Sequence, residues 1–197
     1  MKRKFPLYFV GIAALFLSSC GGGDRTTQAP RNLDDACAII KQHPSWLRDM
    51  KTVERKWGVP VAVQMATIYQ ESKFIGNART PIRYKAGVLP VGRQSSAYGY
   101  AQAIDSTWEW YQRDQGRRSA KRDRFSDATD FIGWYFNESN ERLGLSRFDA
   151  YRQYLAYHDG HTGFKRGTYR SKSWLVNIAR TVEERAITYD TQLRTCA

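Results

Sequence analysis

The strongest constraint on the fold is a stripe of apolar residues near the C-terminal end of the chain, which repeats every three or four positions. The stripe consists of Leu175, Ile178, Val182, Ala186, Tyr189 and Leu193. This spacing places the side chains on one face of an α-helix, and that face must be buried against another element. No stretch shows strong alternation of apolar and polar residues. The sequence therefore predicts a mainly α-helical domain.

Glycine, proline and serine mark where the predicted helices begin and end. Gly58 is placed to end one helix, and Pro60 is placed to open the next helix, which runs to Glu71. Further along, Ser126 is a candidate N-cap for a helix that Gly144 would end. These signals predict several helices separated by short connections.

Residues 75–97 lack helical periodicity and contain Pro81, Gly87, Pro90 and Gly92. Glycine and proline interrupt regular structure, so a long loop or a small hairpin is expected near these residues. A connection of this length in a compact domain often forms part of a binding site.

The N-terminus is typical of a secretory signal peptide. Lys2, Arg3 and Lys4 precede an apolar run over residues 5–17. This run is too short to span a bilayer comfortably, because spanning needs roughly 20 apolar residues. The run leads into Leu17-Ser18-Ser19-Cys20, which resembles the lipobox of bacterial lipoproteins. The alternative is an ordinary signal peptide with an incidental cysteine.

The lipobox resemblance implies a chain divided into three parts. Residues 1–19 are the expected signal peptide, residues 20–31 a short flexible tether, and residues 32–197 one folded domain. Cys20 would carry the lipid. Because Gly21 rather than Asp follows it, the resemblance implies the periplasmic face of the outer membrane.

Lipidation of Cys20 leaves two cysteines, Cys37 and Cys196. Two thiols in an exported, oxidising compartment suggest a disulfide that joins the start of the domain to its last residues. The alternative is two separate buried thiols.

The chain carries a formal net charge of +12. A strongly basic surface favours anionic partners. Export makes nucleic acid an unexpected partner and leaves peptidoglycan stem peptides and lipid headgroups as the available anions. The oligomeric state is not predicted.

Glu71 is the main candidate for catalysis. It lies near the C-terminal end of a predicted helix, where the helix dipole disfavours the charged carboxylate. Enclosure by apolar side chains would raise its pKa further, as a general acid at neutral pH requires. Taken alone, a glutamate at a helix end is far more often a solvated residue than a catalytic one.

Three segments in order distinguish these interpretations: Gln70-Glu71-Ser72, then Gly99-Tyr100-Ala101-Gln102, then Ala156-Tyr157-His158-Asp159-Gly160. Their order and spacing resemble the soluble lytic transglycosylase (SLT-domain) family over roughly residues 45–190. Residues 32–37 and Cys196 also resemble a lipoprotein subgroup of that family.

The resemblance implies a lysozyme-like helical domain with a groove for peptidoglycan glycan strands. Glu71 matches the catalytic glutamate, which protonates the glycosidic oxygen and then acts as base. The family uses one carboxyl group because the muramic acid 6-hydroxyl attacks its own anomeric carbon and closes a 1,6-anhydro ring. The expected substrate-binding residues are Ser72, Ser96, Tyr98, Gly99, Tyr100, Gln102, Tyr157 and His158.

Three positions depart from the family pattern. His158 replaces the usual Asn, so activity is expected to vary between about pH 5 and 8. Tyr100-Ala101 replaces Leu-Met, which would place a larger ring near the groove, and Tyr98 and Tyr100 are the expected sugar contacts. The family serine before Gln102 is assigned here to Ser96.

The sequence also allows other functions. Asp105 or Asp159 could serve as a second carboxylate, as in a goose-type muramidase-like hydrolase that uses water. A non-catalytic lipoprotein that binds glycan strands is a further alternative. A metal site is not expected, because zinc needs three or four ligands and His158 and His161 have no obvious partners. No cofactor is expected.

Overall fold

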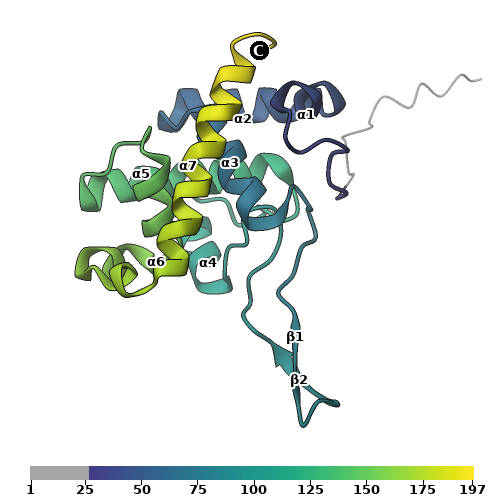
Figure 1. Ribbon diagram of the computed structural model, residues 1–197, viewed down its shortest axis with the longest axis vertical. Helices are drawn as coiled ribbons and strands as arrows, with labels where there is room; N and C mark the ends of the chain where they lie inside the picture. Colours follow the sequence, from purple (N-terminus) through teal and green to yellow (C-terminus); the bar gives the residue numbers. More distant parts are fainter. Residues whose placement is uncertain (1–26) are drawn as a thin grey trace, which may run out of the picture.

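The computed structural model describes residues 27–197 (Figure 1). The predicted signal peptide, Cys20 and most of the predicted tether lie outside the described residues. The described elements are, in chain order, α1 (Ala36–Gln42), α2 (Pro44–Trp57), α3 (Val61–Ser72), β1 (Ile82–Lys85), β2 (Leu89–Arg93), α4 (Asp105–Asp114), α5 (Phe125–Leu143), α6 (Ala150–Arg166), the 3-10 helix η1 (Thr168–Ser171) and α7 (Ser173–Leu193). The predicted mainly helical fold is confirmed. Within residues 27–197, no helix is long and apolar enough to cross a membrane.

Helix α3 lies at the centre of the domain. All residues from Val61 to Ile68 are buried, and α2, α5 and α7 pack against the helix. Figure 1 shows the long helix α7 running across α3. The polar Gln64 is accommodated because its amide donates to the carbonyls of Met50 at 3.0 Å and Val59 at 2.8 Å. The surrounding helices therefore hold α3, and with it Glu71 at its end, in place.

The predicted helix boundaries are mostly confirmed. Gly58 and Gly144 each follow the last residue of a helix with φ of 71° and 68°, a left-handed conformation that glycine adopts without strain. Pro60 lies immediately before α3 rather than at its first position. Ser126 is not the N-cap that the sequence predicts, because α5 begins at Phe125 and the carbonyl of Arg124 accepts its first hydrogen bonds.

The irregular segment near residues 75–97 contains an antiparallel hairpin, which is one of the two structures that the sequence predicts for it. Strands β1 and β2 pair around a turn in which Ala86 and Gly87 both have positive φ, 52° and 75°. The amide of Val88 donates to the carbonyl of Lys85 across this turn. Figure 1 shows the hairpin projecting away from the helical body, and every residue of both strands is exposed.

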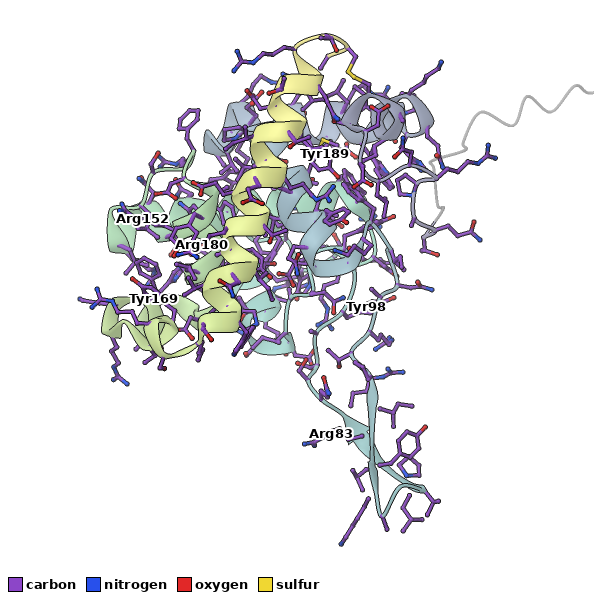
Figure 2. All side chains as sticks on the ribbon, viewed as in Figure 1. Arg83, Tyr98, Arg152, Tyr169, Arg180 and Tyr189 are labelled. Atoms are coloured by element: carbon purple, nitrogen blue, oxygen red, sulfur yellow. A yellow bond between two sulfur atoms is a disulfide. The ribbon has the colours of Figure 1, made fainter. Side chains whose placement is uncertain are left out.

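The predicted disulfide is confirmed between Cys37 in α1 and Cys196 after α7. In Figure 2 the sulfur–sulfur bond lies beside the C-terminal end of α7. The same end of the domain is closed by polar contacts, since the hydroxyl of Tyr189 donates to the Leu33 carbonyl and Arg185 pairs with Asp34 at 3.0 Å. The start and end of the folded domain are thus joined covalently and by hydrogen bonds.

Candidate active site

A cavity of about 570 Å³ opens at the C-terminal end of α3. Its walls come from α3, the base of the hairpin, the segment before α4, the first turn of α4, and helices α5 and α6. The lining residues are Glu71, Thr80, Ser95, Ala97, Gln102, Ala103, Ile104, Thr107, Phe131, Tyr135, Tyr157, His158, Asp159 and Gly160. All three sequence segments therefore contribute to one cavity, through Glu71, Gln102 and the four residues from Tyr157 to Gly160.

Glu71 occupies the last turn of α3, and no basic residue lies in that turn. Its Oε1 atom is buried and has no hydrogen-bond partner among the described residues. Burial raises the pKa of the Glu71 carboxyl to about 7, while a hydrogen bond from Tyr154 and the charge of Lys73 lower it to a smaller extent. At neutral pH this carboxyl group is thus poised between its protonated and ionised forms.

The chain turns sharply after Glu71. Lys73 and Phe74 both have positive φ, 52° and 61°, which is costly for residues other than glycine. Phe74 is fully buried against Trp46, and the ammonium of Lys73 lies 3.7 Å from the centre of the Tyr69 ring. These contacts hold the strained turn and direct the chain from α3 to the hairpin arm.

Tyr154 is the residue of this site that the sequence interpretation missed. It is buried in α6, and the interaction of its hydroxyl with the Glu71 carboxyl lowers the pKa of that carboxyl. In the sequence Tyr154 belongs to an apolar stripe, so it resembled an ordinary core residue. The available signal was its spacing of three from Tyr157, which places the two hydroxyl groups on the same side of the helix.

Tyr157 connects α6 to the segment that carries Gln102. Its hydroxyl donates to the carbonyl of Ala101 at 2.5 Å, and its ring packs edge-on against Phe131 and Tyr135. Burial and the nearby Glu71 carboxylate raise the pKa of the Tyr157 hydroxyl well above its ordinary value. Tyr157 is thus a neutral hydrogen-bonding residue at this site.

Gln102 has a positive φ of 46°, and its side-chain amide nitrogen donates to the carbonyls of Ala78 at 3.0 Å and Gly99 at 2.8 Å. Two carbonyl partners determine the orientation of the amide. The carbonyl oxygen of Gln102 is therefore the side-chain atom left to accept a hydrogen bond in the cavity.

Gly99 and Tyr100 do not lie where sugar-binding residues are expected. A side chain at Gly99 would meet the carbonyl oxygen of Arg122 at 2.1 Å, so the close approach is to protein backbone rather than to a ligand. Tyr100 is buried in the core, edge-on to Trp46 and Phe125. The expectation that Tyr100 contacts sugar is thus wrong, because a ring enclosed in the core cannot reach the groove.

Tyr98 lies beside the cavity without lining it. Its hydroxyl donates to Asp123 at 3.1 Å, and the guanidinium of Arg79 lies 4.1 Å from the ring centre. Figure 2 shows Tyr98 where the hairpin arms leave the helical body. These contacts assign Tyr98 to the support of the hairpin base.

The two predicted serines also lie outside the cavity lining. Ser72 is buried, and its hydroxyl donates to the Ile68 carbonyl at 3.2 Å. The Ser96 hydroxyl accepts a hydrogen bond from the amide of Asp105, the first residue of α4. The serine that lines the cavity is Ser95. The choice of Ser96 is thus corrected, since neighbouring residues in an extended segment point in opposite directions.

His158 lines the cavity and contacts Trp174 edge-on at 5.1 Å. Partial burial and then the charge of Lys172 lower the pKa of the His158 ring, although the Asp159 carboxylate opposes them. The imidazole is thus neutral at neutral pH. The group with a pKa near 7 at this site is Glu71 rather than His158.

Asp159 is the second carboxylate among the described residues that line the cavity. One of its oxygens pairs with the ammonium of Lys172, and the other accepts from the Thr168 hydroxyl. Burial raises its pKa, but these hydrogen bonds outweigh burial and the pKa is lowered. Asp159 is an ionised anchor with both oxygens occupied. Asp105, the other candidate, pairs with Arg122 at 2.7 Å outside the cavity lining.

A second hollow of about 510 Å³ continues the cavity and shares four of its residues, Thr107, Tyr135, Asp159 and Gly160. Trp110, Arg142 and His161 add an aromatic and basic wall to this hollow. Together the two hollows form an elongated groove, which suits a polymer more than a small molecule. Among the described residues, no group of three or more His, Cys, Asp or Glu side chains could hold a metal ion.

A helical domain with one buried, neutral-range carboxyl group in an elongated groove is of the lysozyme-like class. The family model described as "Transglycosylase SLT domain" matches residues 8–196, and the chain belongs to this family. No curated protein sequence matches the chain. Membership implies cleavage of the glycan strands of peptidoglycan in the cell envelope.

Proposed function

We propose that the protein is a lytic transglycosylase that cleaves the β-1,4 bond between N-acetylmuramic acid and N-acetylglucosamine without water. Glu71 is the proposed catalytic residue. The observation that carries the proposal is the position of its carboxyl group in the groove, where burial raises its pKa to about 7 and one buried oxygen has no hydrogen-bond partner among the described residues.

In the first step, protonated Glu71 donates its hydrogen to the glycosidic oxygen as the bond from that oxygen to the anomeric carbon breaks. The N-acetylglucosamine side leaves with that hydrogen as a free hydroxyl group. Tyr154 donates to the carboxyl and stabilises the carboxylate that forms. The raised pKa favours this step because the acid form is substantially populated at neutral pH.

In the second step, the Glu71 carboxylate accepts the hydrogen of the muramic acid 6-hydroxyl. The oxygen of that hydroxyl bonds to the anomeric carbon and closes a 1,6-anhydro ring, which restores protonated Glu71. One residue suffices because the nucleophile belongs to the substrate and is held at the reacting carbon. The engagement of both Asp159 oxygens supports this scheme over one that needs a second free carboxylate.

The remaining cavity residues suit a sugar chain. Gln102 offers a carbonyl oxygen, and Ser95 and Thr80 add hydroxyl groups from the hairpin base. Phe131 and Ile104 provide apolar surface beside them. Such a mixture of few placed polar groups and apolar walls is common in ligand sites.

The proposed location is the periplasmic face of the outer membrane, with a lipid on Cys20. Support comes from the lipobox-like sequence and from the Cys37–Cys196 disulfide, which fits an oxidising compartment. In this proposal residues 1–19 are the signal peptide, residues 20–31 the tether and residues 32–197 the catalytic domain. Membership of the lipoprotein subgroup belongs to the same proposal.

The test is digestion of purified sacculi followed by mass spectrometry of the released fragments. The parent chain is expected to release fragments with 1,6-anhydromuramic ends, which are lighter by one water than hydrolysed ends. The Glu71→Gln variant should release none, while Glu109→Gln, a matched change at an exposed position on α4, should match the parent. Hydrolysed ends would assign the protein to the muramidase-like hydrolases. Equal release by Glu71→Gln would remove Glu71 as the catalyst, and glycan binding without any release would identify a scaffold.

A further inference from the structure

The hairpin of β1 and β2 carries apolar side chains that nothing in the described part of the chain covers. Ile82, Tyr84, Val88, Leu89 and Val91 are all exposed, and they account for half of the large exposed apolar residues of the structure. An isolated two-stranded hairpin is marginal in water, and exposed apolar strands promote aggregation. This segment therefore needs an environment that covers it.

The apolar side chains occupy both faces of the hairpin. Tyr84 pairs with Pro90 across the strands, and its neighbour Lys85 pairs with Leu89. Successive residues in a strand point to opposite faces, so Tyr84 and Leu89 project on opposite sides. A protein partner would cover one face of so thin an element, whereas lipid would surround it.

The charge of the hairpin is of one sign. Between Ser72 and Asp105 the basic residues are Lys73, Arg79, Arg83, Lys85 and Arg93, and there is no acidic residue. Among the described residues, neither Arg83 nor Lys85 forms an ion pair. Figure 2 shows Arg83 on the hairpin, remote from the helical body. Unpaired cations next to exposed aliphatic side chains complement an anionic lipid surface.

We propose that the hairpin is a membrane-contact device whose tip, Ala86 to Leu89, enters the headgroup boundary of an anionic lipid bilayer. Arg83 and Lys85 remain at the level of the phosphates, because long basic side chains extend toward charged headgroups. The insertion is shallow, since a hairpin exposes unpaired backbone groups along both edges and these are not tolerated in the hydrocarbon core.

The position of the hairpin relates membrane contact to the groove. Thr80 and Ser95 at its base line the cavity that holds Glu71, and the Thr80 hydroxyl donates to the Ser95 carbonyl at 2.9 Å. A tip held at the membrane therefore sets the height and orientation of the groove above the lipid. Such a contact favours glycan strands that lie near the membrane surface.

The experiment places an environment-sensitive fluorophore on the hairpin tip of the full chain through Val88→Cys. A label through Phe148→Cys is the matched control, because the two side chains are equally exposed at 74% and 75%. Cys37 and Cys196 are bonded to each other, and the parent chain treated with the reagent reports any labelling of Cys20. Protein bound to vesicles of phosphatidylglycerol and phosphatidylethanolamine is separated by flotation before measurement.

The Val88 label is expected to shift to shorter wavelength, to brighten several-fold, and to be quenched by lipids with a nitroxide near the headgroup. The Phe148 label should not change. Leu89→Asp in the labelled chain should abolish the shift while leaving fragment release from sacculi in solution unchanged, which separates this proposal from the catalytic one. Absence of vesicle binding, or an unshifted Val88 label on bound protein, overturns the proposal. A shift caused by sacculi or by another protein, but not by vesicles, assigns the hairpin to that partner and also overturns it.

Discussion

The hydroxyl of Tyr154 in the middle of α6 interacts with the carboxyl group of Glu71 at the end of α3 and lowers the pKa of that carboxyl group. This interaction stabilises the charged form of a carboxyl group whose burial favours the neutral form. The pKa of about 7 is thus the result of two opposed effects, of which burial is the larger. The balance is adjustable by substitution of either residue.

Removal of the Tyr154 hydroxyl by Tyr154→Phe should raise the pKa of Glu71 further. A hydrogen bond to a charged group contributes about 1.5–3 kcal/mol, so loss of at least about one pKa unit of stabilisation is expected. The limb on which activity falls with rising pH should therefore move to higher pH, and the rate should fall about ten-fold or more. The measurement is fragment release from sacculi across pH, with Tyr151→Phe on the same helix as control. An unmoved limb would contradict the role given to Tyr154.

The raised pKa of Glu71 also affects stability. Glu71 ionises near 4.5 when unfolded and near 7 when folded, so its protonated form is favoured by the fold. This contribution is fully present below pH 4.5 and is lost as pH rises through 7, which costs up to about 3 kcal/mol in alkaline solution. Glu71→Gln, which cannot ionise, should therefore be inactive and more stable than the parent at alkaline pH.

The measurement for this variant is thermal unfolding at acid and alkaline pH. The gain in midpoint should be several degrees in alkaline solution and should shrink toward zero at acid pH, because about 1 kcal/mol shifts the midpoint by ≈ 2–4 °C in a chain of this size. Glu109→Gln should show no such pH-dependent gain. A constant offset at all pH values would mean that the carboxyl group is not held in its neutral form by the fold.

The disulfide should stabilise the domain without serving the chemistry. Cys37 and Cys196 are separated by 159 residues, and loop entropy for so long a loop contributes at most about 5 kcal/mol. Replacement of both cysteines by serine should lower the unfolding midpoint. Activity near room temperature should stay intact, because neither cysteine lines the cavity that contains Glu71. The comparison is thermal unfolding with and without reductant, in which the parent should respond and the variant should not.

The sequence alone predicts the groove residues that belong to its three motifs. Glu71, Gln102 and Tyr157 occur in an order and spacing that few helical domains share, and the structure brings all three to one cavity. Tyr154 could not be recognised in this way. Its spacing is that of a core stripe, and only the folded arrangement of the chain brings its hydroxyl close to the Glu71 carboxyl group.

In irregular segments the sequence does not show which side chains face the core. Tyr98, Tyr100 and Ser96 lie where no helical period indicates which side of the chain faces the core. Tyr100 therefore looked like a groove residue, although it packs on Trp46. The fold class was easier to predict, since stripes such as that of α7 extend over many turns and allow few alternatives.

His158 should have little influence on the pH dependence of activity. Its pKa is lowered by partial burial and by the charge of Lys172, so the ring is already neutral where Glu71 titrates. His158→Asn should keep the falling limb near pH 7, with any change confined to substrate affinity. The check is the pH profile of fragment release, and a displaced limb would show that His158 sets the ionisation of Glu71.

Tyr157→Phe distinguishes the positioning of Gln102 from the ionisation of Glu71, because Tyr157 lies on the same helix as Tyr154 but bonds to Ala101. Its hydroxyl donates to the Ala101 carbonyl, beside Gln102, and not to Glu71. The variant leaves that carbonyl without its partner, at a cost of about 1–3 kcal/mol, and loosens the segment that presents Gln102 to the cavity. The expected result is a loss of rate of about five- to 150-fold, the range that about 1–3 kcal/mol corresponds to. The falling limb should stay in place, whereas Tyr154→Phe moves it. If both variants moved the limb equally, the two tyrosines would act on Glu71 as one unit, and the separate role of the Tyr157–Ala101 bond would be lost.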